Sequence, residues 1–119
     1  MKIAVTSLGE SLESPVDQRF GRTRFFILWD SESGEWSVRN NQQNREAPQG
    51  AGIQAAQHVA NFGVGAVITG HCGPKAYRTL DAAGIPVYAG VSGSVQDALD
   101  AYRAGTLAEA AGQANVDAG

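Results

Sequence analysis

The chain is 119 residues long, with 43% apolar and 18% charged residues, which is enough to bury the core of one domain and excludes a disordered or fibrous protein. Twelve acidic and nine basic residues give a net charge of −3, so bulk attraction to nucleic acid is not expected. The single cysteine excludes an internal disulfide, and the apolar runs are too short to cross a bilayer.

The N-terminal part of the chain is expected to form three strands. Residues 2–6 favour a strand that is buried on both faces. Aromatic and β-branched side chains over residues 23–30 favour a second strand, and turn-forming residues follow it. The alternation around Trp36 and Val38 then completes an antiparallel hairpin.

The rest of the chain is expected to alternate helices with strands. Polar residues with Pro48 and Gly50 indicate a loop over residues 40–50. Apolar periodicity, helix caps and glycine stops then predict helices over about 51–61, 74–83 and 94–104, and strands over about 64–69 and 85–89.

This order of elements predicts an α/β domain with three α/β/α layers. The three buried strands should run parallel and be joined by right-handed crossovers, with the hairpin at one edge. The result is a five-stranded mixed sheet in the order 3-2-1-4-5, with strands numbered along the chain. We expect one domain over residues 1–107 and a disordered C-terminal tail over residues 108–119, where alanine, glycine and polar residues dominate.

Three glycine-rich loops should meet at the carboxyl ends of the parallel strands, where such sheets bind ligands. They are residues 7–22, 70–74 and 90–94. Two of them lead into helix N-termini, which favour anions, and Arg19 and Arg22 add positive charge. The loops therefore predict a cationic crevice for an anion. The alternative is that the glycines only make turns and the arginines only solvate the loops.

His71 and Cys72 precede the expected helix start at Pro74. The helix N-terminus should lower the pKa of the Cys72 thiol and favour a thiolate, which binds soft metals. The alternative for Cys72 is a small buried apolar residue. His71 can be a metal ligand, a donor to an anion or a hydrogen-bonded loop residue. The pair cannot complete a zinc site made of protein ligands alone, because the chain has only one other histidine.

No catalytic motif is recognised. The chain lacks a P-loop motif, and the strands expected over residues 2–6 and 64–69 contain no acidic residue for two-metal chemistry. No histidine base with a carboxylate partner can be identified from spacing. We therefore expect a binding protein that is not an enzyme.

Five short segments follow one another at the spacings of a known protein family: Met1–Val5, Ser14–Val16, Phe20–Arg22, Gly50–Gln54 and Gly70–Pro74. In these segments the chain resembles the nitrogenase cofactor carriers and the related dinitrogenase iron–molybdenum cofactor biosynthesis domains. The resemblance covers about residues 1–107. It implies a ribonuclease-H-like fold, which is compatible with the predicted strand order. It also implies non-covalent binding of an anionic metal–sulfur cluster, without catalysis.

The resemblance further implies the cargo, which is a molybdenum–copper sulfide cluster, as in small single-domain members of the family, or an iron–molybdenum–sulfur cluster precursor. Cys72 and His71 are the candidate metal ligands. Arg19 stands where many members have histidine, and His71–Cys72 replaces a small or amide-containing pair. The expected cluster-binding residues are Arg19, Phe20, Gly21, Arg22, Gly70, His71, Cys72, Gly73, Pro74, Gly90, Ser92 and Gly93.

The expected partners are the inorganic cluster and a donor or recipient metalloprotein, but neither nucleic acid nor a membrane. The start of the chain has no signal-peptide pattern, so a cytoplasmic protein is expected, as a monomer or a weak dimer. Two alternatives stay open. The crevice could bind a small phosphorylated metabolite or nucleotide, or the domain could dock onto a larger metalloprotein through the hairpin edge at Trp36.

Overall fold

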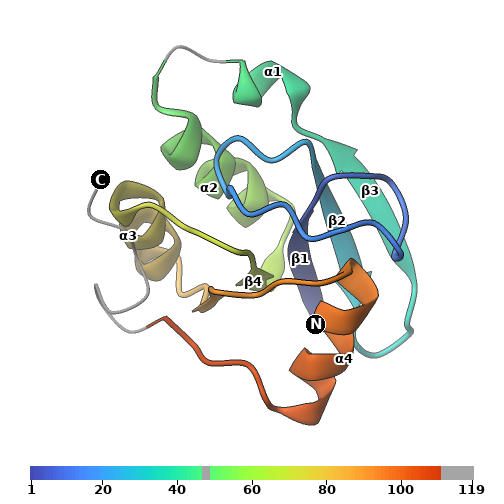
Figure 1. Ribbon diagram of the computed structural model, residues 1–119. Coiled ribbons are helices and arrows are strands. Elements are labelled where there is room, and N and C mark those ends of the chain that lie inside the picture. Colours follow the sequence, from blue (N-terminus) through green and yellow to red (C-terminus); the bar gives the residue numbers. More distant parts are fainter. Residues whose placement is uncertain (47–48, 111–119) are drawn as a thin grey trace.

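A five-stranded mixed sheet forms the middle layer of the domain (Figure 1). The computed structural model describes residues 1–46 and 49–110. The strands are β1 (Lys2–Ser7), β2 (Phe25–Asp30), β3 (Trp36–Asn40), β4 (Val64–Ile68) and β5 (Val87–Tyr88). The helices are α1 (Gln42–Arg45), α2 (Ala51–Asn61), α3 (Pro74–Ala82) and α4 (Val95–Ala104).

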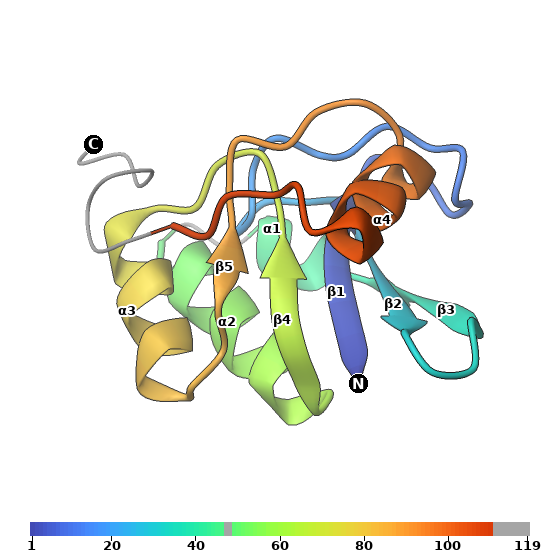
Figure 2. The same ribbon diagram turned by 90° about the horizontal axis from the view of Figure 1, so that it is seen from below.

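The strand order is β3-β2-β1-β4-β5, which confirms the predicted order and the α/β class. β1 pairs in parallel with β4, and β4 with β5, whereas β2 is antiparallel to both β1 and β3. The three parallel strands therefore end at one edge of the sheet. This carboxyl edge is uppermost in Figure 2, where the loops after β1, β4 and β5 lie above the strands.

Separate hydrophobic clusters cover the two faces of the sheet. α2 and α3 pack on one face, through side chains that include Val59 and Leu80. α4 packs on the other face, through Val95 and Leu99. Every residue over 3–5 is fully buried, because β1 lies between the two helical layers. The arrangement confirms the three-layer prediction.

The polar segment before α2 contains a short helix, α1, where the sequence predicted a loop over residues 40–50. Asn44 is buried in this helix, and its Nδ2 donates to Gly21 O (3.1 Å) and to Ala51 O (2.9 Å). Contacts with distant parts of the chain, which no helix propensity encodes, therefore stabilise this turn.

The packed chain extends beyond residue 107, the predicted end of the domain. Ala110 is buried, and its N–H donates to Val87 O (2.8 Å). Glu109 forms an isolated bridge with Tyr88 beside the β5 edge. Residues 111–119, which make up most of the predicted disordered tail, lie outside the described residues. In the described part of the chain, no helix combines the length and the apolar character that a membrane span requires.

Candidate anion-binding site

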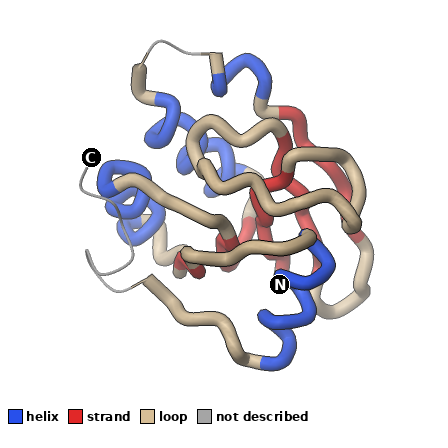
Figure 3. Tube along the Cα trace, in the orientation of Figure 1, coloured by secondary structure: helices blue, strands red, loops and turns tan. Residues whose placement is uncertain are grey.

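The three predicted loops lie together at the carboxyl edge of the sheet (Figure 3). The loop after β1 is joined to the loop after β4, because Phe20 N–H donates to His71 O (3.0 Å). The loop after β4 is joined in turn to the loop after β5, because Gly90 N–H donates to Gly70 O (2.8 Å). Backbone hydrogen bonds thus bring together segments that are far apart in the sequence, as the loop positions predicted.

A cavity of about 330 Å³ lies beside these loops, between the first turns of α2 and α3. Three of the predicted site residues, Gly21, Gly73 and Pro74, line it. The full lining comes from the loop after β1 and from the starts of the two helices: Gly21, Gly50, Ala51, Gly52, Ile53, Gly73, Pro74, Lys75 and Ala76.

The first turns of both helices suit a negatively charged ligand. Neither α2 nor α3 has an acidic residue in its first turn, and no side chain of the described residues caps either N-terminus. The first N–H groups of a helix have no partner within the helix, and the helix dipole makes that end positive. Lys75, exposed in the first turn of α3, adds an ammonium group to the cavity lining.

Glycine lets the backbones around the cavity approach one another closely. A Cβ atom on Gly21 would lie 2.7 Å from the Cα atom of Gly52, and one on Gly52 would lie 3.3 Å from the Cβ atom of Ala76. Asn41 and Asn44 donate from Nδ2 to Gly21 O, at 3.3 and 3.1 Å. These contacts hold the loop after β1 against the start of α2. A residue larger than glycine at position 21 would prevent this close approach.

The predicted residues on either side of Gly21 differ in their roles. Phe20 is buried, and its ring centroid lies 5.7 Å from that of Phe26, so Phe20 belongs to the core. The Arg19 side chain is 54% exposed, with Nε 3.6 Å from Asp17 Oδ1. Arg22 is half-buried. Arg19, Gly21 and Arg22 therefore remain accessible to solvent, whereas Phe20 does not.

Gly70 and His71 support the loop after β1. A Cβ atom on Gly70 would lie 2.7 Å from the Cα atom of Gln18, so this close crossing of two backbones requires glycine. His71 is half-buried, and its backbone pairs with that of Arg19 in an isolated parallel bridge. Both predicted residues therefore contribute to the site through backbone contacts with the loop after β1.

The loop after β5, which contains three predicted site residues, lies against the segment before Arg19. Val16 N–H donates to Gly93 O (2.9 Å). Gly90 and Ser92 are exposed beside it. This loop therefore fixes the path of the loop after β1, and the cavity lining is built from the other two loops and from α2.

The start of α4 carries its own cap. Ser94 Oγ accepts from Asp97 N–H (3.0 Å), and Asp97 Oδ2 accepts from Ser94 N–H (3.2 Å). This reciprocal pair is a capping box, and it confirms the helix cap predicted at the start of the 94–104 helix. Because the carboxylate already lies at this helix N-terminus, the start of α4 does not favour an additional anion.

The predicted low pKa of Cys72 is wrong. The side chain is fully buried in the hydrophobic cluster under α2 and α3, and this burial raises the pKa of the thiol to about 12. The thiol lies 3.7 Å from its acceptor, Gly73 O. Loss of hydration outweighs the helix dipole, and the alternative prediction, a small buried apolar residue, is confirmed. Among residues 1–46 and 49–110, no group of three His, Cys, Asp or Glu side chains is placed to hold a metal ion.

The sequence prediction missed the start of α2, Gly50–Ile53, and two residues of α3, Lys75 and Ala76. A helix that leads into a parallel strand runs antiparallel to it, so α2 has to begin at the edge where β4 ends. This rule, applied to a Gly50–Gln54 segment that already carried a family resemblance, would have placed α2 in the site.

Comparisons with known proteins show close relatives over nearly the whole chain. The profile of a family described as dinitrogenase iron–molybdenum cofactor matches residues 1–105. An uncharacterised protein of Methanocaldococcus jannaschii is 33% identical over 90 residues, which make up 74% of this chain and 76% of that protein. The apo form of the orange protein from Desulfovibrio gigas is 38% identical, with a TM-score of 0.91 and 93% of each chain covered. A Thermotoga protein of the DUF35 family, solved by NMR, is also 38% identical, with a TM-score of 0.80 and 91% of each chain covered.

Proposed function

Because this chain belongs to the dinitrogenase iron–molybdenum cofactor family, we propose that it binds an anionic molybdenum-containing metal–sulfide cluster and carries it without catalysing a reaction. The cargo is a molybdenum–copper sulfide cluster or an iron–molybdenum cofactor precursor. The observation that carries the proposal is the cavity between α2 and α3, where two helices begin without an acidic residue or a side-chain cap from the described residues.

The cluster would be held by its negative charge. Backbone N–H groups in the first turns of α2 and α3 donate to sulfide or oxide atoms, as helix N-termini do for other anions. Lys75 in the cavity lining, and Arg19 and Arg22 in the neighbouring loop after β1, would add charge-assisted hydrogen bonds, which are the stronger kind. Apolar side chains in the lining, Ile53 and Pro74, shield part of the cluster from water.

The binding would be non-covalent. The Cys72 thiol is fully buried and stays protonated at neutral pH, so it is a poor ligand for a metal in the cavity. The cluster therefore keeps its own sulfide ligands, and the protein recognises their charge. His71 remains the predicted candidate for a direct contact from the loop after β4.

Reconstitution tests the proposal. Purified apo protein is mixed with tetrathiomolybdate and copper, desalted, and examined for visible absorption and bound molybdenum. Lys75→Gln and Arg78→Gln make a matched pair, since both remove one exposed charge from α3 but only Lys75 lines the cavity. We expect coloured wild-type protein, a weakened K75Q and an unchanged R78Q. Wild-type protein that retains no molybdenum would contradict the proposal.

A phosphorylated metabolite or nucleotide is the second candidate ligand, because the same N–H groups suit a phosphate. A ligand at one hundred times its Kd stabilises a folded protein by about 2.7 kcal/mol, which a thermal-shift screen detects. Stabilisation by nucleotides without stabilisation by thiometallates would favour this candidate over the cluster.

Delivery of a cluster requires a donor or a recipient metalloprotein. β3 is an edge strand, and Trp36 on it is 42% exposed, which favours this edge as the docking surface of such a partner. Trp36→Ala should then leave cluster retention unchanged while it weakens partner binding. Arg19→Gln should do the reverse. Loss of partner binding in the arginine variant alone would place the docking surface at the cavity.

A further inference from the structure

Asp17 is the one acidic side chain that is buried in the part of the chain that the structure describes. It lies two residues before Arg19, in the loop proposed to contact an anion. A buried carboxylate loses hydration and repels a nearby negative charge. Hydrogen bonds or a nearby positive charge must therefore compensate for the lost hydration and the repulsion at this edge.

The carboxylate of Asp17 closes the turn that follows it. Oδ1 accepts from Arg19 N–H and Oδ2 accepts from Arg24 N–H, both at 3.1 Å. One carboxylate thereby holds the two ends of the segment that contains Gly21 and Arg22. Within that segment, Gly21 lies against α2 and lines the cavity.

The backbone of Asp17 is fixed to β1, the central strand of the sheet. Its N–H donates to Thr6 O (2.9 Å), and its carbonyl accepts from Thr6 Oγ1 (2.7 Å). Thr6 Oγ1 also lies 2.9 Å from Thr69 Oγ1, just beyond the end of β4. The position of the carboxylate is therefore set by the rigid part of the fold, as a residue that orients others requires.

Asp17 also contacts the side chain of Arg19. Oδ1 lies 3.6 Å from Nε, while the arginine side chain remains 54% exposed. A guanidinium has five N–H donors, so a contact at Nε leaves donors on the terminal nitrogens for a ligand. The carboxylate can thus restrict the arginine without occupying all of its hydrogen-bonding capacity.

We propose that Asp17 is a positioning residue for the anion site, which holds the Arg19 side chain in the orientation that meets the ligand. This inference rests on the proposed function. Asp17 does not touch the anion. It acts through Arg19. Its own negative charge repels the anion, and the orientation that it gives to Arg19 compensates for this repulsion.

A double-mutant cycle tests the assignment. Asp17→Asn, Arg19→Gln and the double variant are dialysed against the copper–tetrathiomolybdate mixture, and bound molybdenum is measured together with the unfolding temperature. Asp100→Asn, an exposed residue of α4, controls for the loss of one negative charge. We expect D17N to weaken binding about tenfold when Arg19 is present and less than about twofold in the R19Q background.

Equal losses in the two backgrounds would overturn the assignment, because a purely structural role lowers affinity whether or not Arg19 is present. Binding by R19Q and D17N that is as tight as that of wild type would overturn it as well. If D17N does not fold, Arg19→Lys serves as the second variant, since it keeps the charge but has no Nε. A tenfold loss in R19K supports the assignment, and wild-type affinity contradicts it. Failure of wild-type protein to bind would instead refute the proposed function.

Discussion

The starts of α4 and of α2 and α3 lie at the same edge of the sheet but differ in how their N–H groups are used. α4 begins with the Ser94–Asp97 capping box, and the N–H groups of Val95 and Gln96 donate to carbonyls of the loop after β1, so the first donors of this helix are already satisfied. α2 and α3 begin at a cavity, with no acidic residue in the first turn and no cap from the described residues. The first arrangement stabilises a helix, whereas the second leaves donors for a ligand.

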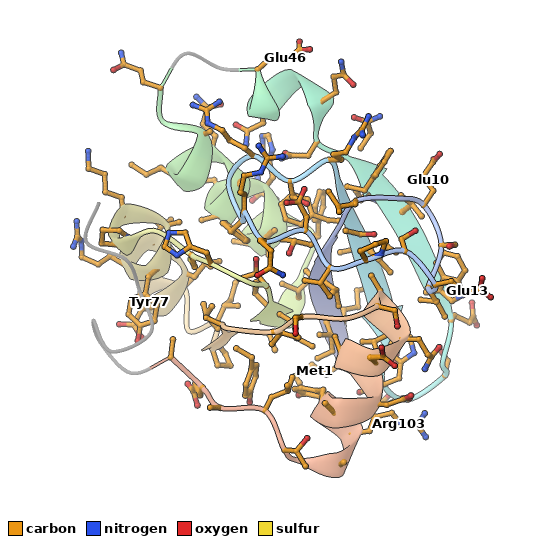
Figure 4. All side chains as sticks on the ribbon, in the orientation of Figure 1. Met1, Glu10, Glu13, Glu46, Tyr77 and Arg103 are labelled. Atoms are coloured by element: carbon orange, nitrogen blue, oxygen red, sulfur yellow. The ribbon has the colours of Figure 1, made fainter. Side chains whose placement is uncertain are left out.

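Charged side chains also differ between the start of α4 and the cavity at the starts of α2 and α3. Figure 4 shows Glu10 and Glu13 of the loop after β1 on the opposite side of the molecule from Tyr77 of α3, whereas Asp17 of the same loop is buried beside Arg19. Gln96 N–H donates to Leu12 O (2.8 Å), which holds the segment with Glu10 and Glu13 on the start of α4. Lys75 lies on the other side, at the cavity. An acidic protein can therefore still present one locally cationic region.

The largest effect is expected from a side chain placed between the loop after β1 and α2, where the two backbones are in close contact. Gly21→Ala places a Cβ atom 2.7 Å from the Gly52 backbone, so the loop must move away from the helix. Overpacking of this kind costs about 1–3 kcal/mol, and we expect loss of most cluster retention. Urea unfolding and molybdenum analysis after desalting measure the two effects.

Gly73→Ala is the control for that variant. Gly73 also lines the cavity, but its φ is −65° and a Cβ atom there meets no described atom within 4 Å. The protein should unfold at the wild-type urea concentration. Equal destabilisation by G21A and G73A would show that close backbone contact at Gly21 is not what shapes the site.

A carboxylate at the start of α3 would make it resemble the start of α4. Lys75→Glu should stabilise the helix N-terminus by about 0.3–1 kcal/mol through the helix dipole. It should at the same time weaken cluster binding by about tenfold or more, since a cation is replaced by an anion. Thermal unfolding and dialysis measure these opposite changes. Binding that rises or stays constant in K75E would place the cluster elsewhere.

Removal of the α4 cap should affect stability alone. Ser94→Ala deletes the acceptor for Asp97 N–H and is expected to cost about 1 kcal/mol in the free energy of unfolding. Molybdenum retention should remain at the wild-type level at a temperature where both proteins are folded. A selective loss of retention in S94A would mean that the start of α4 also belongs to the site.

The smallest expected effect concerns Cys72. Burial raises the pKa of the thiol from 9.0 to about 12, so the unfolded chain loses this proton at lower pH than the folded protein. The thiol's contribution to stability is therefore complete below pH 9.0 and is lost as the pH rises from 9.0 toward about 12. Iodoacetamide at about pH 8 should not modify the native protein but should modify it in urea. Rapid native modification would contradict this burial.

Much of the fold follows from local patterns in the sequence. The capping box at Ser94, the glycine after α2 at position 63 and the apolar strands each act over a few residues, so their positions were predictable. The topology then follows from the handedness of the crossovers, which brings the loops after β1, β4 and β5 to one edge.

The remainder of the site depends on contacts between distant residues. The direction of the Cys72 side chain is set by the core under α2 and α3, which the neighbouring sequence does not encode. The short helix α1 depends on hydrogen bonds from Asn44 to Gly21 and Ala51. The loop after β5 was expected in the crevice, but its glycines, Gly90 and Gly93, adopt positive φ, and its backbone hydrogen-bonds to the loops after β1 and β4. Such roles appear only once the packing is known.

The most direct test of the central claim is an amide NMR titration of the ¹⁵N-labelled apo protein with tetrathiomolybdate and copper. The account predicts the largest shifts at the N–H groups of Gly52, Ile53, Lys75 and Ala76, with those of Gln96 and Asp97 nearly unchanged. Shifts concentrated at the start of α4, or spread evenly over both regions, would contradict it.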